Sequence, residues 1–318
     1  MKKIMITGGL GCIGLEVTKL LDRSKYNVKI FDLPESRFDG YNSPNTEYFF
    51  GSILDRTALL DALKGVEVVI HLAAYLGVER TETNRLRGLD INIFGTQNVI
   101  EASLISGVKK IVFASSSEIY GDPVVDNINE DCSDRGKSVY AISKLAGEEY
   151  LKAYSKVSDL KATIIRFFNT FGPRQEPQFV VPKFISQVIN GKNPTVYGDG
   201  KQLRSYCYVT DSASGLIKAM EYENDQKINI FNIGNPSNKI TLIDLANLIC
   251  EIYGNKNIKP EIIGNFNDTD RDENREIFKR VCDISKAESE LNYKPKISLL
   301  DGIKKIKLDG LPYARWTN

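Results

Sequence analysis

The sequence TGGLGCIG at residues 7–14 stands between an apolar stretch at 4–6 and a segment whose apolar residues recur at helical spacing. It satisfies two glycine patterns, TGxxGxxG and GxGxxG. In such a strand, turn and helix, the glycines allow a tight turn and let a pyrophosphate approach the backbone N–H groups at the helix N-terminus. The segment therefore predicts a dinucleotide-binding site. The residues expected at the cofactor here are Gly8, Gly11, Cys12, Ile13 and Gly14.

A carboxylate follows at the distance that this interpretation requires. Asp32 lies 18 residues after Gly14, at the end of a second apolar stretch at 28–31. A carboxylate in this place accepts hydrogen bonds from the adenosine ribose hydroxyls and repels a 2′-phosphate. The sequence therefore favours NAD over NADP. The nearest cation that could offset this preference is Arg37.

Short β-branched stretches alternate with helix-like segments through about residue 170, which indicates parallel βαβ units. We predict an α/β fold, a doubly wound parallel Rossmann sheet at 1–170, with a smaller C-terminal α/β lobe at 171–318 that returns some segments to the sheet. The polar stretch at 265–276 is expected to be a solvated loop. The expected strands are 4–6, 28–31, 66–70, 110–113 and 162–167, and the expected helices are 13–21, 59–63, 89–102, 140–154, 182–189, 211–220 and 242–253.

Composition narrows the classes of function. The 42 Lys and Arg residues nearly balance the 41 Asp and Glu residues, so the charge does not indicate a nucleic-acid partner. No apolar stretch approaches the roughly 20 residues of a membrane-spanning helix, so no membrane role is expected. The five cysteines are scattered without a CxxC pair, which indicates free thiols in the cytoplasm and no metal site. His71 is expected to be structural, since it has no apparent triad partner.

A tyrosine and a lysine stand one helical turn apart in the sequence YAISK at 140–144. At this spacing the Tyr140 phenol and the Lys144 ammonium share one face of a helix. An ammonium, together with the cationic ring of an oxidised nicotinamide, favours the phenolate and makes Tyr140 a candidate general base. The sequence SSSE at 115–118 follows the strand expected at 110–113, where doubly wound folds carry their active sites.

On these motifs the sequence resembles the extended short-chain dehydrogenase/reductase family, and within it the NAD-dependent nucleotide-sugar epimerases, dehydratases and decarboxylases. The resemblance covers nearly the whole chain. Its motifs occur in the order and approximate spacing of that family: the glycine loop, Asp32, HLAA at 71–74, the serine-rich strand end, Tyr140 with Lys144, RFFN at 166–169, GPR at 172–174 and RSY at 204–206.

The resemblance implies a role for each candidate residue. Ser116 should hydrogen-bond the sugar hydroxyl that is oxidised, Tyr140 should remove its proton, and Lys144 should hold the nicotinamide ribose and tune Tyr140. Ser117 is the second candidate for the serine that hydrogen-bonds this hydroxyl. The nucleotide-diphosphate sugar should lie between the lobes, and 171–318 should be mainly a nucleotide-sugar-binding lobe. The remaining implied cofactor contacts are Ser52, Ile53, Leu72, Ala73 and Ala74, and the implied substrate contacts are Asn169, Tyr197, Arg204 and Arg280.

The fate of the oxidised sugar stays open among three reactions. The resemblance implies hydride transfer to NAD, most often from C4, and we favour a 4-epimerase, which returns the hydride to the other face. Glu118, a candidate catalytic residue, departs from the small residue that many 4-epimerases have there and resembles the Ser-Glu pair of 4,6-dehydratases and of decarboxylases of the UDP-glucuronate type. The alternative is that Glu118 is only a carboxylate at a strand end. Against a dehydratase, Ser117 stands where dehydratases of deoxythymidine sugars have aspartate. An inactive NAD-binding scaffold is a remote alternative. The family also implies a homodimer through the helices expected at 89–102 and 140–154.

Overall fold

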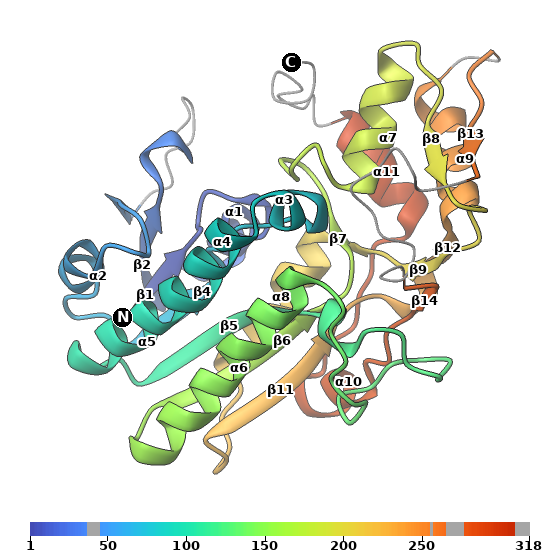
Figure 1. Ribbon diagram of the computed structural model, residues 1–318. Coiled ribbons are helices and arrows are strands. Elements are labelled where there is room, and N and C mark those ends of the chain that lie inside the picture. Colours follow the sequence, from blue (N-terminus) through green and yellow to red (C-terminus); the bar gives the residue numbers. More distant parts are fainter. Residues whose placement is uncertain (37–44, 255–256, 265–276, 309–318) are drawn as a thin grey trace.

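The computed structural model describes residues 1–36, 45–254, 257–264 and 277–308, so Arg37 and the stretch at 265–276 lie outside the described residues. A seven-stranded sheet of the order β11-β6-β5-β4-β1-β2-β3 runs through the larger lobe (Figure 1). Every neighbouring pair in it is parallel. This confirms the doubly wound α/β fold. The strands are β1 (Lys2–Thr7), β2 (Tyr26–Asp32), β3 (Thr46–Phe50), β4 (Val68–His71), β5 (Lys110–Ser116), β6 (Lys161–Phe167) and β11 (Ile228–Ile233).

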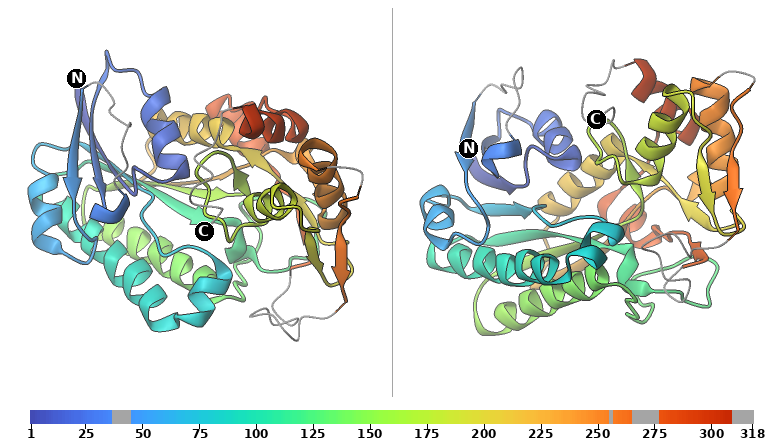
Figure 2. Two further views of the ribbon diagram at one scale, coloured as in Figure 1. Left: turned by 90° about the horizontal axis from the view of Figure 1, so that it is seen from above. Right: turned by 45° about the horizontal axis from the view of Figure 1, so that its top comes forward.

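Helices cover both faces of this sheet, because its inner strands are apolar on both sides. One face packs against α1, α8 and α10, with Leu15 and Leu216 in its core. The other packs against α2, α5 and α6, with Val99 and Leu151 buried there. In both views of Figure 2 the teal helix α5 and the green helix α6 run side by side. Across the described ranges, no helix is long and apolar enough to cross a membrane. The helices are α1 (Cys12–Leu20), α2 (Arg56–Ala62), α3 (Val78–Thr83), α4 (Arg85–Leu89), α5 (Gly95–Ile105), α6 (Val139–Val157), α8 (Val209–Glu221) and α10 (Ser285–Leu291).

The strand order reverses between β1 and β4, which are neighbours although β2 and β3 intervene in the sequence. Their carboxyl ends approach closely here. Gly8 has a φ of +68°, and a Cβ on it would lie 2.7 Å from the backbone nitrogen of Ala73. The position therefore requires glycine. Such a reversal opens the crevice in which doubly wound folds bind their ligands.

The second half of the chain builds a smaller lobe and also completes the sheet, because β11 pairs with β6. The smaller lobe has its own core, where Phe184, Val196, Leu245 and Ile303 are buried. Its short strands pair as β10-β7, β12-β9-β14 and β13-β8. A domain boundary at residue 170 stays a prediction. The elements of this part are β7 (Thr170–Phe171), α7 (Val180–Ile189), β8 (Thr195–Tyr197), β9 (Leu203–Ser205), β10 (Cys207–Tyr208), β12 (Lys239–Thr241), α9 (Leu242–Tyr253), β13 (Glu261–Ile263), β14 (Lys279–Arg280) and α11 (Leu299–Leu308).

The helix expected at 89–102 is part of an unbroken helical run over residues 85–105 that changes its hydrogen-bonding pattern in the middle. A π-helical turn at Asp90–Phe94 separates α4 from α5. Inside this turn Asn92 is buried, and its amide bonds both backbone groups of Tyr75, with Oδ1 accepting from the nitrogen at 2.7 Å and Nδ2 donating to the oxygen at 3.1 Å. A π-helical turn often marks a functional site, and here it fixes the loop after β4.

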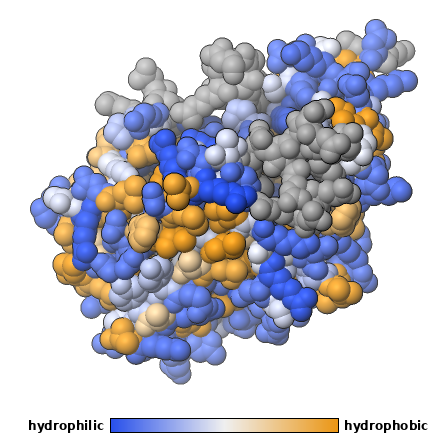
Figure 3. Space-filling view, in the orientation of Figure 1, coloured by the Kyte–Doolittle hydropathy of each residue, from blue (hydrophilic) through white to orange (hydrophobic). Residues whose placement is uncertain are grey.

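Apolar side chains are exposed on the face formed by α4, the π-helical turn and α6. Leu86, Phe94 and Ile142 are 78%, 55% and 52% exposed. Figure 3 shows apolar side chains gathered on the same side of the molecule that carries these helices in Figure 1. A contiguous apolar surface of this kind is typical of a protein contact.

Candidate active site

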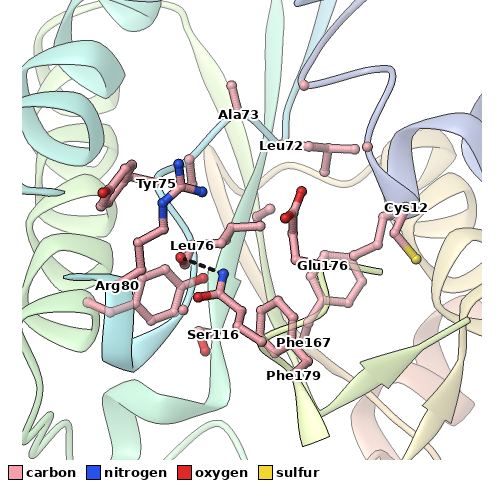
Figure 4. Close-up of a pocket in the computed structure, with 18 of the residues that line it drawn as sticks. Cys12, Leu72, Ala73, Tyr75, Leu76, Arg80, Ser116, Phe167, Glu176 and Phe179 are labelled. Atoms are coloured by element: carbon pink, nitrogen blue, oxygen red, sulfur yellow. Dashed lines mark hydrogen bonds between the residues drawn. The ribbon is translucent and has the colours of Figure 1, made fainter. Parts of the chain in front are cut away.

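A cavity of about 1160 Å³ lies between the two lobes at the carboxyl end of the sheet. The close-up in Figure 4 shows Leu72, Ala73 and Ser116 of the larger lobe around the same space as Glu176 and Phe179. The structure brings nearly all the residues predicted from the sequence to its walls. Those that line it are Gly8, Gly11, Cys12, Ile13, Gly14, Asp32, Ser52, Ile53, Leu72, Ala73, Ala74, Ser116, Ser117, Glu118, Tyr140, Lys144, Asn169, Arg204 and Arg280.

Tyr197 is the predicted substrate contact that does not line this cavity. It ends β8, which pairs with β13 inside the smaller lobe, and the Nζ of Lys183 lies 5.4 Å from its ring centroid. Its carbonyl accepts a hydrogen bond from Nε2 of Gln202 at 3.2 Å, and Gln202 does line the cavity. The aromatic side chain therefore contributes to packing of the lobe, while its backbone holds a cavity residue.

The wall formed by β1, α1 and β2 carries the features that a dinucleotide requires. Helix α1 begins after Gly11, and no side chain caps its first turn, so its N–H groups are free to bind a pyrophosphate. The Asp32 carboxylate accepts from the backbone nitrogens of Leu10 and Leu33, both at 2.8 Å. These bonds fix the carboxylate and leave lone pairs for ribose hydroxyls. Because Arg37 lies outside the described residues, the preference over NADP stays a prediction.

His71 is structural, as the sequence indicates. Its ring is buried between two hydroxyls, with Nδ1 2.7 Å from Thr7 Oγ1 and Nε2 3.1 Å from Thr96 Oγ1. Burial, and then the nearby charge of Lys144, lower the pKa of His71 to about 3. A neutral imidazole at the end of β4 therefore joins β1 to α5 and does not face the cavity.

The catalytic candidates come from β5 and α6. Ser116 ends β5, and its Oγ accepts from the backbone nitrogen of Glu118 at 3.2 Å. Ser138 caps α6 by accepting from the nitrogen of Ala141 at 3.1 Å, which places Tyr140 in the first turn and Lys144 in the second. The Nζ of Lys144 lies 5.7 Å from the Tyr140 ring centroid, so the pair shares one helix face as predicted.

The side chains of the protein do not by themselves favour a phenolate at Tyr140. Burial, followed by the charge of Glu118, raises the pKa of Tyr140 above its usual range, while a hydrogen bond with Ser116 and the charge of Arg280 lower it. Burial lowers the pKa of Lys144 to about 7, against the opposing charge of Glu148. Desolvation therefore dominates both groups, and activation of Tyr140 requires the added positive charge of an oxidised nicotinamide.

Glu118 and Arg280 meet in the cavity although they are far apart in the sequence. Oε1 of Glu118 lies 3.3 Å from Nη1 of Arg280, and Oε2 accepts from Ser138 Oγ at 3.1 Å. Nη2 of Arg280 donates to Oδ1 of Asn169 at 3.0 Å. Both partners are largely buried, with 19% and 11% of their side chains exposed. The carboxylate is thus engaged at both oxygens.

Sequence reasoning missed three side chains that shape the cavity or its walls. Asn92 joins the loop after β4 to α6, since its Nδ2 also donates to Ser143 Oγ at 3.1 Å. The Arg80 guanidinium lies 4.4 Å from the Tyr75 ring centroid (Figure 4). Gln178 of the smaller lobe donates to the Leu76 carbonyl at 3.1 Å, the dashed line in Figure 4. An amide among apolar helical residues was the available signal for Asn92.

Comparison with known proteins shows relatives across nearly the whole chain. The model of the NAD dependent epimerase/dehydratase family matches residues 4–234. A putative UDP-glucose 4-epimerase of Methanocaldococcus jannaschii is 34% identical over 310 residues, covering 95% of this chain and 96% of that protein. A UDP-N-acetyl-alpha-D-glucosaminuronate decarboxylase of Bacillus cytotoxicus is 35% identical over 251 residues, covering 75% and 76%.

A solved structure extends the likeness to the fold. The UDP-glucuronic acid 4-epimerase of Bacillus cereus, in complex with UDP-glucuronic acid and NAD, is similar with a TM-score of 0.85 at 28% identity, covering 96% of this chain and 97% of that one. The matches span both lobes, and the cofactor of the matched family is NAD. The chain therefore belongs to the NAD-dependent epimerase/dehydratase family.

Proposed function

We propose that this enzyme is a UDP-sugar 4-epimerase. The observation that carries the proposal is the engagement of Glu118, whose two oxygens are held by Arg280 and Ser138. A carboxylate held in this way is poorly placed to take a proton from C5 of a sugar. A 4-epimerase needs no such group, because it transfers one hydroxyl proton and returns the hydride to the same carbon.

Gly8, Gly11 and Asp32 line the wall that would hold NAD, which would supply the acceptor for the C4 hydride. Three side chains of the protein have separate roles in the first step, the oxidation of the sugar at C4. Tyr140 takes the proton of the C4 hydroxyl as the C=O bond forms, and Ser116 holds the oxygen. The Lys144 ammonium favours the phenolate and holds the nicotinamide ribose. Since these three side chains meet in one cavity, turnover is favoured over an inactive scaffold.

The cavity suits a nucleotide-diphosphate sugar beside the cofactor. Its volume of about 1160 Å³ exceeds the roughly 300–1,000 Å³ of an ordinary small-molecule site, as expected for two nucleotides. Arg204 and Arg280 line it and offer guanidinium groups, which bind a diphosphate through paired hydrogen bonds. The relatives named above act on UDP-sugars, and this supports uridine as the base.

Decarboxylation of a UDP-uronic acid is the second candidate, supported by the 35% identity to the decarboxylase of Bacillus cytotoxicus. Dehydration is disfavoured, since Ser117 is a buried neutral side chain where an acid would be required.

Proton NMR of the products tests the proposal. The enzyme with NAD is incubated separately with UDP-glucose, UDP-galactose and UDP-glucuronic acid. A 4-epimerase should produce the same final ratio of the two C4 epimers whether the reaction starts from UDP-glucose or from UDP-galactose. A pentose product formed from UDP-glucuronic acid would establish decarboxylation in its place, and no conversion of any UDP-sugar would overturn both candidates.

A further inference from the structure

Helix α6 carries a buried carboxylate, that of Glu148, one turn beyond Lys144. Glu148 stands at i+4 from Lys144 and at i+8 from Tyr140, so the three lie along the face that α6 turns toward the sheet. Its side chain is 0% exposed. Burial of a carboxylate is costly unless it is paired and fully hydrogen-bonded, so its partners show what the position does.

Two neighbouring strands supply those partners. Ser115 of β5 donates from Oγ to Oε1 of Glu148 at 2.5 Å. Arg166 of β6 donates from Nε to Oε1 at 3.1 Å and from Nη2 to Oε2 at 2.8 Å. The bidentate geometry fixes the carboxylate in orientation as well as in position. Glu148 therefore ties α6 to the strand end that carries Ser116.

The same arginine also holds the segment after the catalytic serine. Nη1 of Arg166 donates to the Tyr120 hydroxyl at 3.0 Å, and Nη2 lies 3.3 Å from Oδ1 of Asp134. Tyr120 ends the helical turn that begins at Ser117. Asp134 is partly exposed, so the fully buried part of this group is the ion pair between Glu148 and Arg166.

The negative charge of Glu148 acts on Lys144, which lies one helical turn away. Glu148 opposes the lowering of the Lys144 pKa that burial causes. The other groups against Lys144 are the neutral His71 from β4, the Phe113 ring of β5 with its centroid 4.9 Å from Nζ, and the Tyr140 ring on the same helix. None of these three supplies negative charge while Tyr140 is protonated.

We propose that Glu148 is a positioning residue for hydride transfer, which holds the strand end that carries Ser116 against the helix that carries Tyr140 and Lys144. The inference rests on the oxidation step that epimerisation, decarboxylation and dehydration share. The role of Glu148 is therefore independent of which of the three reactions follows the oxidation. A result against the 4-epimerase would not refute this role, and a result against this role would not refute the 4-epimerase.

Glu148→Gln in the full chain tests it, with Glu149→Gln as the matched control. Glu149 is the next residue of α6, pairs with Lys152 at the surface and is 68% exposed. In Glu148→Gln, kcat should fall about 10-fold or more as the catalytic groups lose their alignment. Because the opposing charge is lost, Lys144 should lose its proton at lower pH. The alkaline limb of the pH profile should therefore move down by about one unit. Glu149→Gln should change neither.

A double variant separates this role from a contribution to stability alone. Glu148→Leu with Arg166→Met removes both buried charges, a change that proteins often tolerate. A folded double variant should still have low kcat and the shifted alkaline limb, with NAD affinity near that of the wild type in calorimetry. Wild-type kcat and pH profile in either folded variant would overturn the proposal. Ser115→Ala removes the hydrogen bond between β5 and Glu148 and keeps the charge of Glu148. It should lower kcat without moving the alkaline limb, and an unchanged kcat would show that Glu148 does not hold the strand end that carries Ser116.

Discussion

Replacing Glu118 by glutamine removes one negative charge beside Ser116 and keeps the shape of the side chain. Its carboxylate lies 3.3 Å from the Arg280 guanidinium and accepts from Ser138. At an effective dielectric constant of ~20, unit charges at this distance attract by about 5 kcal/mol. Desolvation of two largely buried groups offsets much of this. The amide oxygen of the glutamine can still accept from Arg280, and Arg280 keeps its hydrogen bond to Asn169. The free energy of unfolding should therefore fall by only about 2 kcal/mol.

The effect on turnover distinguishes a neighbour from an acid or base. In a 4-epimerase, Glu118→Gln should lower kcat/KM by less than ~10-fold, whereas loss of a general acid or base costs ~10² or more. Urea unfolding and steady-state kinetics on the same preparation measure both quantities. Asp122→Asn is the control, since Asp122 forms a half-exposed pair with Lys137 in the same segment, and it should leave turnover unchanged. A ~10²-fold loss in Glu118→Gln with unchanged stability would refute this reasoning.

Three further predictions follow from the site and the surface. Tyr140→Phe should lose at least ~10² in turnover while NAD still binds in calorimetry, because the proton acceptor is removed; near-normal turnover would contradict that role. The Asp32 carboxylate should favour NAD over NADP by more than tenfold, about 1.4 kcal/mol, and equal affinities would show that Arg37 or another cation offsets it. The exposed apolar face around Phe94 should be the interface of a homodimer. Light scattering at micromolar concentration should therefore give twice the chain mass for the wild type and the single chain mass for Phe94→Glu. A monomeric wild type would contradict this interface.

Much of the sheet could be predicted from local pattern because its inner strands are short, apolar and separated by helical spacing. Two strands escaped this reasoning. Thr46–Phe50 forms the edge strand β3, whose aromatic residues at 48–50 favour a strand but whose side chains are all at least partly exposed. Ile228–Ile233 follows the smaller lobe in the sequence yet pairs with β6. Pairing across such a separation depends on how the whole chain folds, which a local pattern does not specify.

In the candidate site, too, some features could be predicted from local sequence and others could not. Asp32, Ser116 and Tyr140 were predictable because strand ends and helix starts converge at one edge of a doubly wound sheet. The pairing of Glu118 with Arg280 was not, since it depends on how the smaller lobe seats against the larger one. The raised pKa of Tyr140 also departs from the pattern, because the i+4 spacing reports the neighbouring ammonium but not the burial of the phenol.

The mass of the wild-type product formed in heavy water tests the central claim most directly. In a 4-epimerase the hydride that leaves C4 stays on the enzyme and returns to C4, so no carbon of the sugar exchanges with solvent. With UDP-glucose, UDP-galactose and UDP-glucuronic acid as substrates, the account predicts a product of unchanged mass without carbon-bound deuterium. A product lighter by carbon dioxide or water, with solvent deuterium on a carbon, would contradict it.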